Sequence, residues 1–238
     1  HTLLFISHKL DEVRAISDDI TVMRRGTTVG EADPKTVTKK ELAELMVGSE
    51  LPSPETEEST VTDQVLLDLK DVNLIDEGGR YLLKDINLTI HKGEVLGIAG
   101  VEGNGQAELV ETIMGMRQST GHITLNGDDL IDNDTRERRE AGVGFIPEDR
   151  HHHGLLLDAP LWENRVLGHQ TRPPCAKGWL INRPGARGDT DRIVEEYDVR
   201  TPSIDTHARA LSGGNQQKLI VGREMSSDPI LLIAAHPT

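Results

Sequence analysis

The amino-acid sequence predicts an α/β fold with a mainly parallel central sheet, and three observations lead to this prediction. Short apolar runs of the kind found in buried strands alternate with helical stretches along residues 65–238. One of these runs, at residues 94–99, leads into a glycine-rich turn and then a helical stretch. A glycine pair precedes the last helical stretch, and a further apolar run follows it. The chain has 238 residues, which is enough for one or two domains.

The first 50 residues carry the pattern of a small unit of their own. An apolar run at residues 2–6 is followed by a helical stretch at residues 11–17. Residues 20–31 alternate between apolar and polar side chains, which predicts a short hairpin. Because a domain seldom begins and ends on core strands, which bury little without sheet neighbours, we expect this chain to be a piece of a longer protein.

A second helix is predicted to begin at Thr38. Thr38 stands three residues before Glu41 and ahead of an apolar pattern, which is the spacing of a capping box. Gly48 is placed to end this helix in the left-handed conformation. Residues 51–64 are rich in Pro, Ser, Thr and Glu, and they are predicted to form a linker.

The segment after the linker supplies most of the predicted α/β fold. Its apolar runs predict strands at residues 65–69, 88–90, 94–99, 122–125, 143–146 and 230–233. Helices are predicted at residues 106–114 and after Gly213-Gly214, and a turn at Asn126-Gly127. Residues 160–209 have a mostly helical pattern that a Pro- and Gly-rich loop at 172–188 interrupts.

Charge and composition exclude some classes of function. Lys and Arg number 26 and Asp and Glu number 40, which gives a net charge of −14 and argues against a general nucleic-acid binder. Cys175 is the only cysteine, so no intrachain disulfide forms, and a free thiol fits a reducing compartment. No apolar run approaches the ~20 residues that span a bilayer, so we expect any link to a membrane to come through a partner.

The most specific string in the chain is Leu211-Ser212-Gly213-Gly214-Asn215-Gln216-Gln217-Lys218. Two glycines after a serine let the backbone approach a ligand, and the positive end of the following helix favours a phosphate. A Ser-Gly-Gly helix start alone is usually only a cap. The full string, however, resembles the signature motif of ABC ATPases, in the form seen in importers of ribose, other simple sugars and nucleosides. The residues that this resemblance assigns to nucleotide binding are Ser212, Gly213, Gly214, Asn215 and Gln216.

The same resemblance implies a phosphate-binding loop after a strand, and the matching residues lie at 100–108. They are Gly100, Val101, Glu102, Gly103, Asn104, Gly105, Gln106, Ala107 and Glu108. In such a loop the glycine amides hold phosphates, a Lys reaches the β- and γ-oxygens, and a Ser or Thr hydroxyl binds Mg²⁺. Here the three glycines are present, but Gln106 replaces the Lys and Ala107 replaces the Ser or Thr, so the Walker A motif is degenerate.

Two further positions depart from the family pattern. The last strand leads into Ala235 and His236, where the family has the Asp that orients Mg²⁺ and the Glu that polarises the attacking water. Glu148 stands where a Gln commonly contacts Mg²⁺ and the membrane subunit. Since each lost charge-assisted bond weakens binding by ~1.5–3 kcal/mol, we expect this site to hold ATP poorly and not to hydrolyse it. We assign no residue of this chain as a metal ligand.

His8 resembles the switch histidine of ABC ATPases, which contacts the γ-phosphate, because it follows an apolar run and precedes a helical stretch. It lies before the phosphate loop, whereas one domain carries its switch histidine at the end. The resemblance therefore implies tandem domains: residues 1–50 end a first nucleotide-binding domain, and residues 65–238 form a second one that is truncated after its degenerate Walker B strand. His8 and the signature would then serve a competent ATP and Mg²⁺ site completed by the rest of the subunit.

As a whole, the resemblance implies a P-loop ABC-type ATPase domain with a parallel core, an antiparallel β subdomain and a helical subdomain. The implied partners are transmembrane permease subunits, met by residues 148–162, and indirectly an extracytoplasmic solute-binding protein, but no nucleic acid. The implied location is the cytoplasmic face of the cell membrane, as a peripheral subunit. Sugar and nucleoside both stay open as the solute. The alternatives are a structural or regulatory ABC module without hydrolysis, and a non-transport ABC ATPase that acts on nucleic acid.

Two weaker patterns complete the analysis. The run His151-His152-His153 is predicted to be a solvated loop rather than a metal site, because three consecutive side chains do not readily converge on one ion. Tyr81 is a candidate for stacking on adenine, although it stands a few residues later than the family pattern places such a residue.

Overall fold

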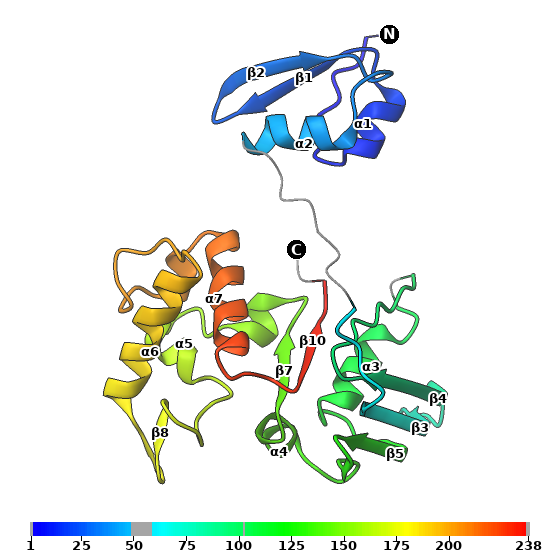
Figure 1. The fold of residues 1–238 in the computed structure, drawn as a ribbon, viewed down its shortest axis with the longest axis vertical. Helices are drawn as coiled ribbons and strands as arrows, with labels where there is room; N and C mark the ends of the chain where they lie inside the picture. The colour runs from blue at the N-terminus through cyan, green and yellow to red at the C-terminus, as the bar shows by residue number, and fades with distance from the viewer. Residues whose placement is uncertain (1, 49–58, 102, 237–238) are drawn as a thin grey trace. The chain divides into compact units, whose positions relative to one another are not determined.

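The computed structural model describes residues 2–48, 59–101 and 103–236. The chain divides into two compact units, His1–Ser59 and Thr60–Thr238. The division falls inside the predicted linker, most of which lies outside the described residues. Each unit has its own hydrophobic core. Figure 1 shows the helices and strands of both units. No helix within the described ranges is both long enough and apolar enough to span a bilayer.

The first unit is a hairpin covered by two helices. Its elements are α1 (Leu10–Ile16), β1 (Ile20–Arg24), β2 (Thr27–Ala32) and α2 (Lys39–Val47). The predicted capping box is present, because Thr38 Oγ1 accepts from the Glu41 amide at 3.2 Å and Glu41 accepts from the Thr38 amide at 2.7 Å. Gly48 ends α2 at φ 84°, as predicted. The small core contains Ile20, Val22, Val37 and Leu42.

The apolar run at residues 2–6, whose strand-like pattern predicts a strand, does not form one. The segment has no assigned strand, and the side chains of Leu3, Leu4 and Ile6 are 81%, 86% and 87% exposed. No described strand pairs with this segment, so its backbone has no ladder partner and its side chains have no core to enter.

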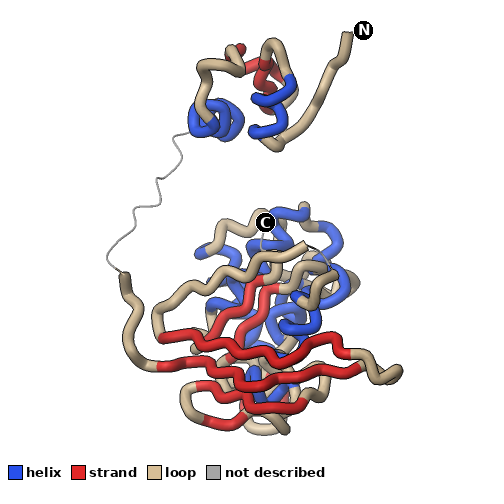
Figure 2. The backbone as a smooth tube through the Cα atoms, turned by 90° about the vertical axis from the view of Figure 1, so that its right-hand side faces the viewer, coloured by secondary structure: helices blue, strands red, loops and turns tan. Residues whose placement is uncertain are grey.

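An antiparallel sheet forms one part of the second unit. Its strands follow the order β4-β3-β5-β6, with β3 at Val65–Ile75, β4 at Tyr81–His91, β5 at Thr120–Leu125 and β6 at Asp128–Asp129. Asn126 and Gly127, at φ 52° and 91°, make the predicted turn. Helix α3 (Gln106–Ile113) packs on the sheet through a core that includes Leu67, Ile113 and Ile123. Figure 2 shows these strands side by side with helices behind them.

The parallel part of the fold is the pair β7 (Val143–Ile146) and β10 (Leu231–Ala234), and with the helices and the antiparallel sheet it gives the predicted α/β class. Among the described strands the predicted mainly parallel sheet is limited to this pair. The predicted strand at residues 94–99 is absent, and Val95 is 97% exposed. None of the described strands hydrogen-bonds to residues 94–99, so this apolar run has no ladder partner and does not form a strand.

A helical part completes the second unit. Its core includes Leu161, Ile193, Leu219 and Ile220. Its helices are α5 (Leu161–Val166), α6 (Arg183–Glu196) and α7 (Gly213–Met225), with a π-helical turn η1 (Arg150–Gly154), a 3-10 turn η2 (Ala208–Ala210) and a short hairpin of β8 (Ala176–Lys177) and β9 (Leu180–Ile181). Helix α4 (Thr135–Glu140), which the sequence analysis missed, precedes β7.

The interrupting loop is shorter than the predicted 172–188, because α6 already begins at Arg183. The Asn182 side chain accepts from the Gly185 amide at 3.3 Å and so caps the helix. Pro184 stands within the first turn, where its missing amide hydrogen costs no helical hydrogen bond.

Candidate functional site

The glycine-rich loop before α3 has the backbone that its sequence requires. Gly103 and Gly105 adopt φ 84° and 100°, a region that side chains with a Cβ disfavour. Gly105 is the N-cap of α3, and a Cβ there would lie 3.2 Å from the Leu83 side chain. Both the dihedral angle and the close approach therefore require glycine at position 105. Glu102 lies outside the described residues.

Gln106 folds back over this loop. Its Nε2 donates to the Val101 carbonyl at 3.0 Å, and its Oε1 accepts from the Asn104 amide at 3.1 Å. A Cβ on Gly100 would lie only 2.2 Å from Gln106 Nε2, so the side chain runs close against the start of the loop. The amide of Asn104 is one that a phosphate would need in such a loop, and here a side chain of the loop itself already occupies it.

The other residues of the loop bring neither an ammonium group nor a hydroxyl group. Ala107 is exposed and has no oxygen with which to bind a metal ion, and Glu108 lies half-buried in the first turn of α3. The Asn104 side chain donates to the Val101 carbonyl at 2.9 Å, which also closes the loop on itself. We missed this role of Asn104 because it depends on the folded path of the loop.

The structure brings Glu148 and His236 together. Strands β7 and β10 run parallel, and the amide of Ala235 donates to the Ile146 carbonyl at 2.9 Å, so the segments after both strands meet at one edge. His236 Nδ1 and Glu148 Oε1 are 2.8 Å apart, and both side chains are exposed. Ligands of open α/β sheets bind outside such carboxyl ends, and here the two groups present contact each other instead.

These residues do not fit a Mg²⁺ ion. Ala107 and Ala235 lack oxygen atoms, while the carboxylate of Glu148 is engaged by an imidazole. Among the residues that the structure describes, no group of three His, Cys, Asp or Glu side chains is arranged to hold a metal ion. The three histidines at 151–153 belong to η1, where the carboxylate of Asp149 accepts from the first two of their amides.

The signature string starts α7, and its first residues are exposed. Ser212 is the N-cap, and its hydroxyl accepts from the Asn215 side chain at 3.0 Å instead of from a helix amide. Asn215 in turn accepts from the Arg200 amide at 2.9 Å. Gly213 and Gly214 are open to solvent at the positive end of the helix. This geometry leaves the backbone of Ser212-Gly213-Gly214 accessible to an anion.

Gln216 faces inward and does not line the same surface. It is 4% exposed, donates to the Ala208 carbonyl at 3.1 Å and contacts His151 Nε2 at 2.9 Å. Gln216 therefore joins the start of α7 to η1 and η2. His151, which its sequence predicts to lie in a solvated loop, is instead part of η1 and contacts a side chain 65 residues away.

The loop and the signature belong to different parts of the second unit. The loop lies at α3 beside the antiparallel sheet, and the signature lies at the free end of α7 in the helical part (Figure 1). His8 is an exposed residue of the first unit, just before α1. Tyr81, at the start of β4, is 51% exposed, with Lys84 Nζ 5.6 Å from its ring centre.

A buried group of charges at the other end of α7 was missed by the sequence analysis. Glu224 is 1% exposed; its Oε2 accepts from Arg139 at 2.8 Å and from the Phe145 amide at 3.2 Å, and its Oε1 accepts from Arg223 at 2.9 Å. We call Arg139, Arg223 and Glu224 the Glu224 cluster. Burial alone would raise the pKa of Glu224, but the charges of Arg223 and Arg139 hold it below the ordinary value.

The Glu224 cluster joins α7 to the strand that leads to Glu148. Phe145 is in β7, three residues before Glu148, and Arg223 donates to the Gly154 carbonyl at 2.8 Å, at the end of η1. His169 lies beside the cluster, where its Nδ1 meets the Ser227 hydroxyl at 3.0 Å. Burial, together with the charge of Arg165, lowers the pKa of His169 to about 3, so the ring is neutral at physiological pH.

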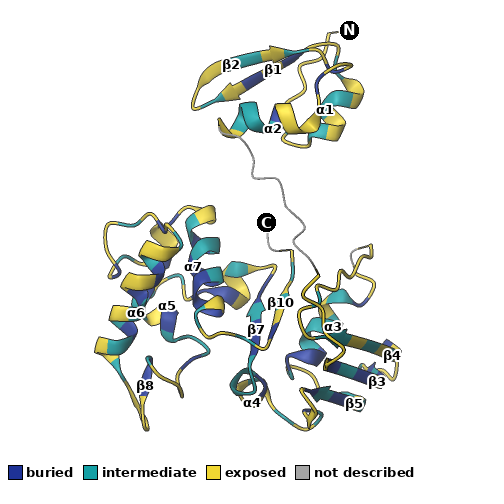
Figure 3. Cartoon of the chain, viewed as in Figure 1, coloured by how far each residue is buried: buried dark blue, intermediate teal, exposed yellow. Residues whose placement is uncertain are grey.

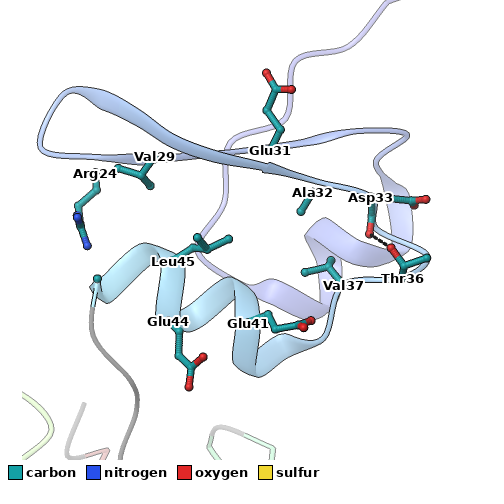
Figure 4. Close-up of a pocket in the computed structure, with 11 residues that line it drawn as sticks. Arg24, Val29, Glu31, Ala32, Asp33, Thr36, Val37, Glu41, Glu44 and Leu45 are labelled. Atoms are coloured by element: carbon teal, nitrogen blue, oxygen red, sulfur yellow. Dashed lines mark hydrogen bonds between the residues drawn. The ribbon is translucent and has the colours of Figure 1, made fainter.

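A broad, open pocket of about 930 Å³ lies in the first unit between the hairpin and α2 (Figure 4). Its lining mixes the carboxylates Glu31 and Glu41 with the apolar Val29 and Leu45. No predicted site residue lines it, so it gives no support to a nucleotide site there.

The fold and the site together define an ATP-binding cassette domain. Its features are a mixed α/β fold, a glycine-rich loop before a helix, two parallel strands whose ends meet, and a helix that starts with Ser-Gly-Gly. Residues 83–238, more than half of the chain, match the family model described as ABC transporter. The chain belongs to this family.

Relatives and solved structures agree with this assignment. The chain is 42% identical over 224 residues to the guanosine import ATP-binding protein NupO of Bacillus subtilis (strain 168), an alignment that covers 94% of this chain and 44% of that protein. It is 40% identical over 240 residues to the glucose import ATP-binding protein TsgD13 of Haloferax volcanii, and this alignment covers 100% of this chain and 44% of that protein. It is 32% identical over 237 residues to the galactose/methyl galactoside import ATP-binding protein MglA of Vibrio cholerae, and this alignment covers 99% of this chain and 46% of that protein. The chain thus spans about half the length of the relatives it matches.

Among solved structures, the fold resembles the dimeric post-hydrolysis state of the ATP-binding cassette MJ0796 bound to ADP and Pi. The TM-score is 0.59 at 23% identity, covering 73% of this chain and 75% of that one. A nucleotide-free ATP-binding cassette from an ABC transporter gives a TM-score of 0.58 at 20% identity, and the match covers 73% of this chain and 70% of that one. At these identities the likeness establishes the fold alone.

Proposed function

We propose that this chain is part of the ATP-binding subunit of an ABC importer that couples ATP binding and hydrolysis to the uptake of a nucleoside or simple sugar. The observation that carries the proposal is the signature at the start of α7, with exposed Gly213 and Gly214, inside a domain of the ABC transporter family. Relatives that cover nearly all of the chain are import ATP-binding proteins for guanosine, glucose and galactose. Their different solutes leave the choice between nucleoside and sugar open.

The site built on residues 100–108 is the silent one of the subunit. Gln106 satisfies the Asn104 amide, Ala107 brings no hydroxyl, and the Glu148–His236 contact stands where a metal ion would be coordinated. A site without a Lys, a metal-binding hydroxyl and a catalytic carboxylate lacks the groups that neutralise the charge developing during phosphoryl transfer. No step of hydrolysis is assigned to it.

The competent site is completed outside this chain. His8 and the exposed Ser212-Gly213-Gly214 backbone are its contributions, the first as the switch histidine and the second as amides for the terminal phosphate. Mg²⁺ belongs to that site of the whole subunit. Permease subunits contact residues 148–162, a solute-binding protein acts on the other side of the membrane, and the subunit is peripheral on the cytoplasmic face. The tandem division into residues 1–50, 51–64 and 65–238 is part of the same proposal.

An ATPase assay with two proteins tests the proposal. The purified chain should hydrolyse no ATP with Mg²⁺, while the full subunit with its membrane partners should, and Ser212→Ala in the full subunit should abolish most of that activity. Asn133→Ala, in a loop outside both motifs, is the matched control and should leave the rate unchanged. Hydrolysis by the isolated chain that Ser212→Ala removes would contradict the proposal.

A second candidate, a structural or regulatory module without nucleotide, is favoured by one observation, the self-satisfied loop around Gln106. Calorimetry of the full subunit with ATP separates the two candidates. Binding with a stoichiometry of at least one supports the importer, and no binding in the presence of the membrane partners supports the module. A nucleic-acid ATPase is disfavoured by the charge of −14.

A further inference from the structure

The hairpin of β8 and β9 presents apolar side chains to solvent. We call residues 176–181 the Trp179 hairpin. Trp179 is 104% exposed, Leu180 75% and Ile181 43%, and these three follow one another at the tip and the outgoing strand. Figure 3 shows β8 at the far end of the helical part, with its outer end coloured as exposed. A fully exposed Trp next to two large aliphatic side chains lowers the solubility of a protein, and such exposed apolar surfaces often mark a binding site for a partner or a membrane.

The base of the Trp179 hairpin is held firmly, so the exposure of its tip is built into the fold. Cys175 and Ala176 are 0% and 4% exposed. The amide of Ala176 donates to the Arg172 carbonyl at 2.8 Å, and the amide of Asn182 donates to the Cys175 carbonyl at 2.8 Å. The Asn182 side chain also donates to the Pro174 carbonyl at 3.0 Å. The structure thus presents the tip on an ordered base.

The charge around the hairpin is opposite to that of the rest of the chain. Residues 164–188 contain no Asp or Glu in a chain of net charge −14, and their basic residues are Arg165, Arg172, Lys177, Arg183 and Arg187. Arg165 pairs with Asp189, and Arg187 pairs with Asp205. The other three are exposed, and no carboxylate in the described ranges lies within ion-pairing distance of them.

We propose that the Trp179 hairpin inserts its tip into the interfacial layer of an anionic lipid bilayer. Trp is favoured at the level of lipid headgroups, and aliphatic neighbours enter the acyl boundary. Lys and Arg side chains that have no carboxylate partner attract anionic headgroups when they lie beside an apolar tip. A narrow projecting tip of three apolar residues suits a fluid surface better than a protein interface, which needs a larger complementary face. The hairpin gives the chain a direct contact with lipid, in addition to the link through a partner that the sequence suggested.

This inference does not depend on nucleotide chemistry, so it can be tested on the chain itself. The chain has two Trp residues, Trp162 and Trp179, and Trp162 lies against Arg183 and Arg187 at 6.0 and 5.9 Å. Trp162→Phe leaves Trp179 as the sole indole. Vesicles of phosphatidylglycerol and phosphatidylcholine are added, and the emission maximum is followed. We expect a blue shift with anionic vesicles, quenching by lipids brominated near the headgroup, and little change with pure phosphatidylcholine.

Matched variants separate specific contact from general charge. Replacing Arg172, Lys177 and Arg183 with Gln should weaken vesicle partitioning by about fivefold per residue, which is the effect of ~1 kcal/mol for each cation near an anionic surface. The control replaces Lys84, Lys92 and Arg136, exposed cations elsewhere in the second unit, and should change partitioning far less. Trp179→Ser should abolish sedimentation with vesicles, while its urea unfolding midpoint stays unchanged.

The inference is overturned by any of three results: no blue shift with anionic vesicles, equal binding to neutral vesicles, or equal losses from the test and control sets. Crosslinking of position 179 to a permease subunit, with no quenching by brominated lipid in the assembled complex, would also overturn it in favour of a protein partner. None of these results bears on ATP hydrolysis, so the proposed function stands or fails separately.

Discussion

Glu224→Gln is the substitution that most directly disturbs the Glu224 cluster. The change keeps the shape of the side chain but removes the negative charge that two guanidinium groups share. It also places an amide NH₂ group against Arg139 or Arg223, where both neighbours are donors. Because Glu224 is 1% exposed and Arg223 4%, water cannot replace the lost carboxylate.

The magnitude follows from burial. Removing one partner of a buried charge pair costs ~3–5 kcal/mol, because the other charge is left without compensation. Gln retains one acceptor, so we expect the lower part of this range, about 3 kcal/mol in the free energy of unfolding. Domains are stable by only ~5–15 kcal/mol, so the second unit should remain folded at 25 °C but melt clearly earlier.

Urea unfolding of the chain, followed by circular dichroism, measures this loss. Glu196→Gln is the matched control, since Glu196 pairs with Arg192 at 2.5 Å on α6 but both side chains are about half exposed. Helical pairs of this kind contribute ~0.3–0.5 kcal/mol. The pH dependence adds a second readout. The pKa of Glu224 is lowered in the folded state, so its contribution is complete above the ordinary value of 4.5 and is lost as the pH falls through the folded-state pKa.

Two results would refute the reasoning. One is a loss for Glu224→Gln no larger than that for Glu196→Gln. The other is a difference between wild type and Glu224→Gln that does not shrink below pH 4.5, because a loss of packing alone would be independent of the protonation of the carboxylate.

Three other predictions concern separate parts of the chain. Burial lowers the pKa of His169 from 6.5 to about 3, so the free energy of unfolding should fall by about 2 kcal/mol between pH 7 and pH 5. His169→Gln should remove this pH dependence in urea titrations at the two pH values. An equal pH dependence in the wild type and in His169→Gln would contradict the assignment. Thr38→Ala should destabilise α2 by ~1 kcal/mol and speed amide exchange across it, and unchanged exchange would count against the capping box. Gly105→Ala should lower stability by ~1–2 kcal/mol in thermal melts, since φ is 100° and Leu83 is close, and an unaltered melting temperature would disprove the strain.

Local signals in the sequence were enough for the elements that depend on near neighbours. The capping box of Thr38 and Glu41 and the turn at Asn126 were predicted and are present. The same local rule also describes α4, where the Asp134 side chain accepts from the Glu137 amide at 2.8 Å. The sequence therefore carries a local signal for α4 of the same kind as that for α2, although this helix was not predicted.

Pairing between distant segments could not be predicted in the same way. Residues 94–99 have the apolar pattern of a buried strand, yet a strand exists only where a neighbour supplies its hydrogen bonds. Arg139 and Glu224 stand 85 residues apart, and a charge in either helical pattern is normally a solvated residue. Their contact follows from the packing of α4, β7 and α7, which no local pattern specifies.

In the proposed phosphate loop at residues 100–108, Gln106 has a second effect besides the absence of a Lys. The sequence resemblance places Gln106 where a phosphate-binding loop has a Lys. In the structure its side chain also accepts from the Asn104 amide, so it would compete with a phosphate for that donor. Gln106→Lys would remove the competitor and add a cation in one step, whereas Ala235 and His236, which directly follow β10, would be unchanged. Since binding of phosphate and polarisation of water depend on these separate groups, we expect Gln106→Lys to raise nucleotide affinity without restoring hydrolysis. At the proposed silent site, weak binding and absent hydrolysis would therefore have separate causes.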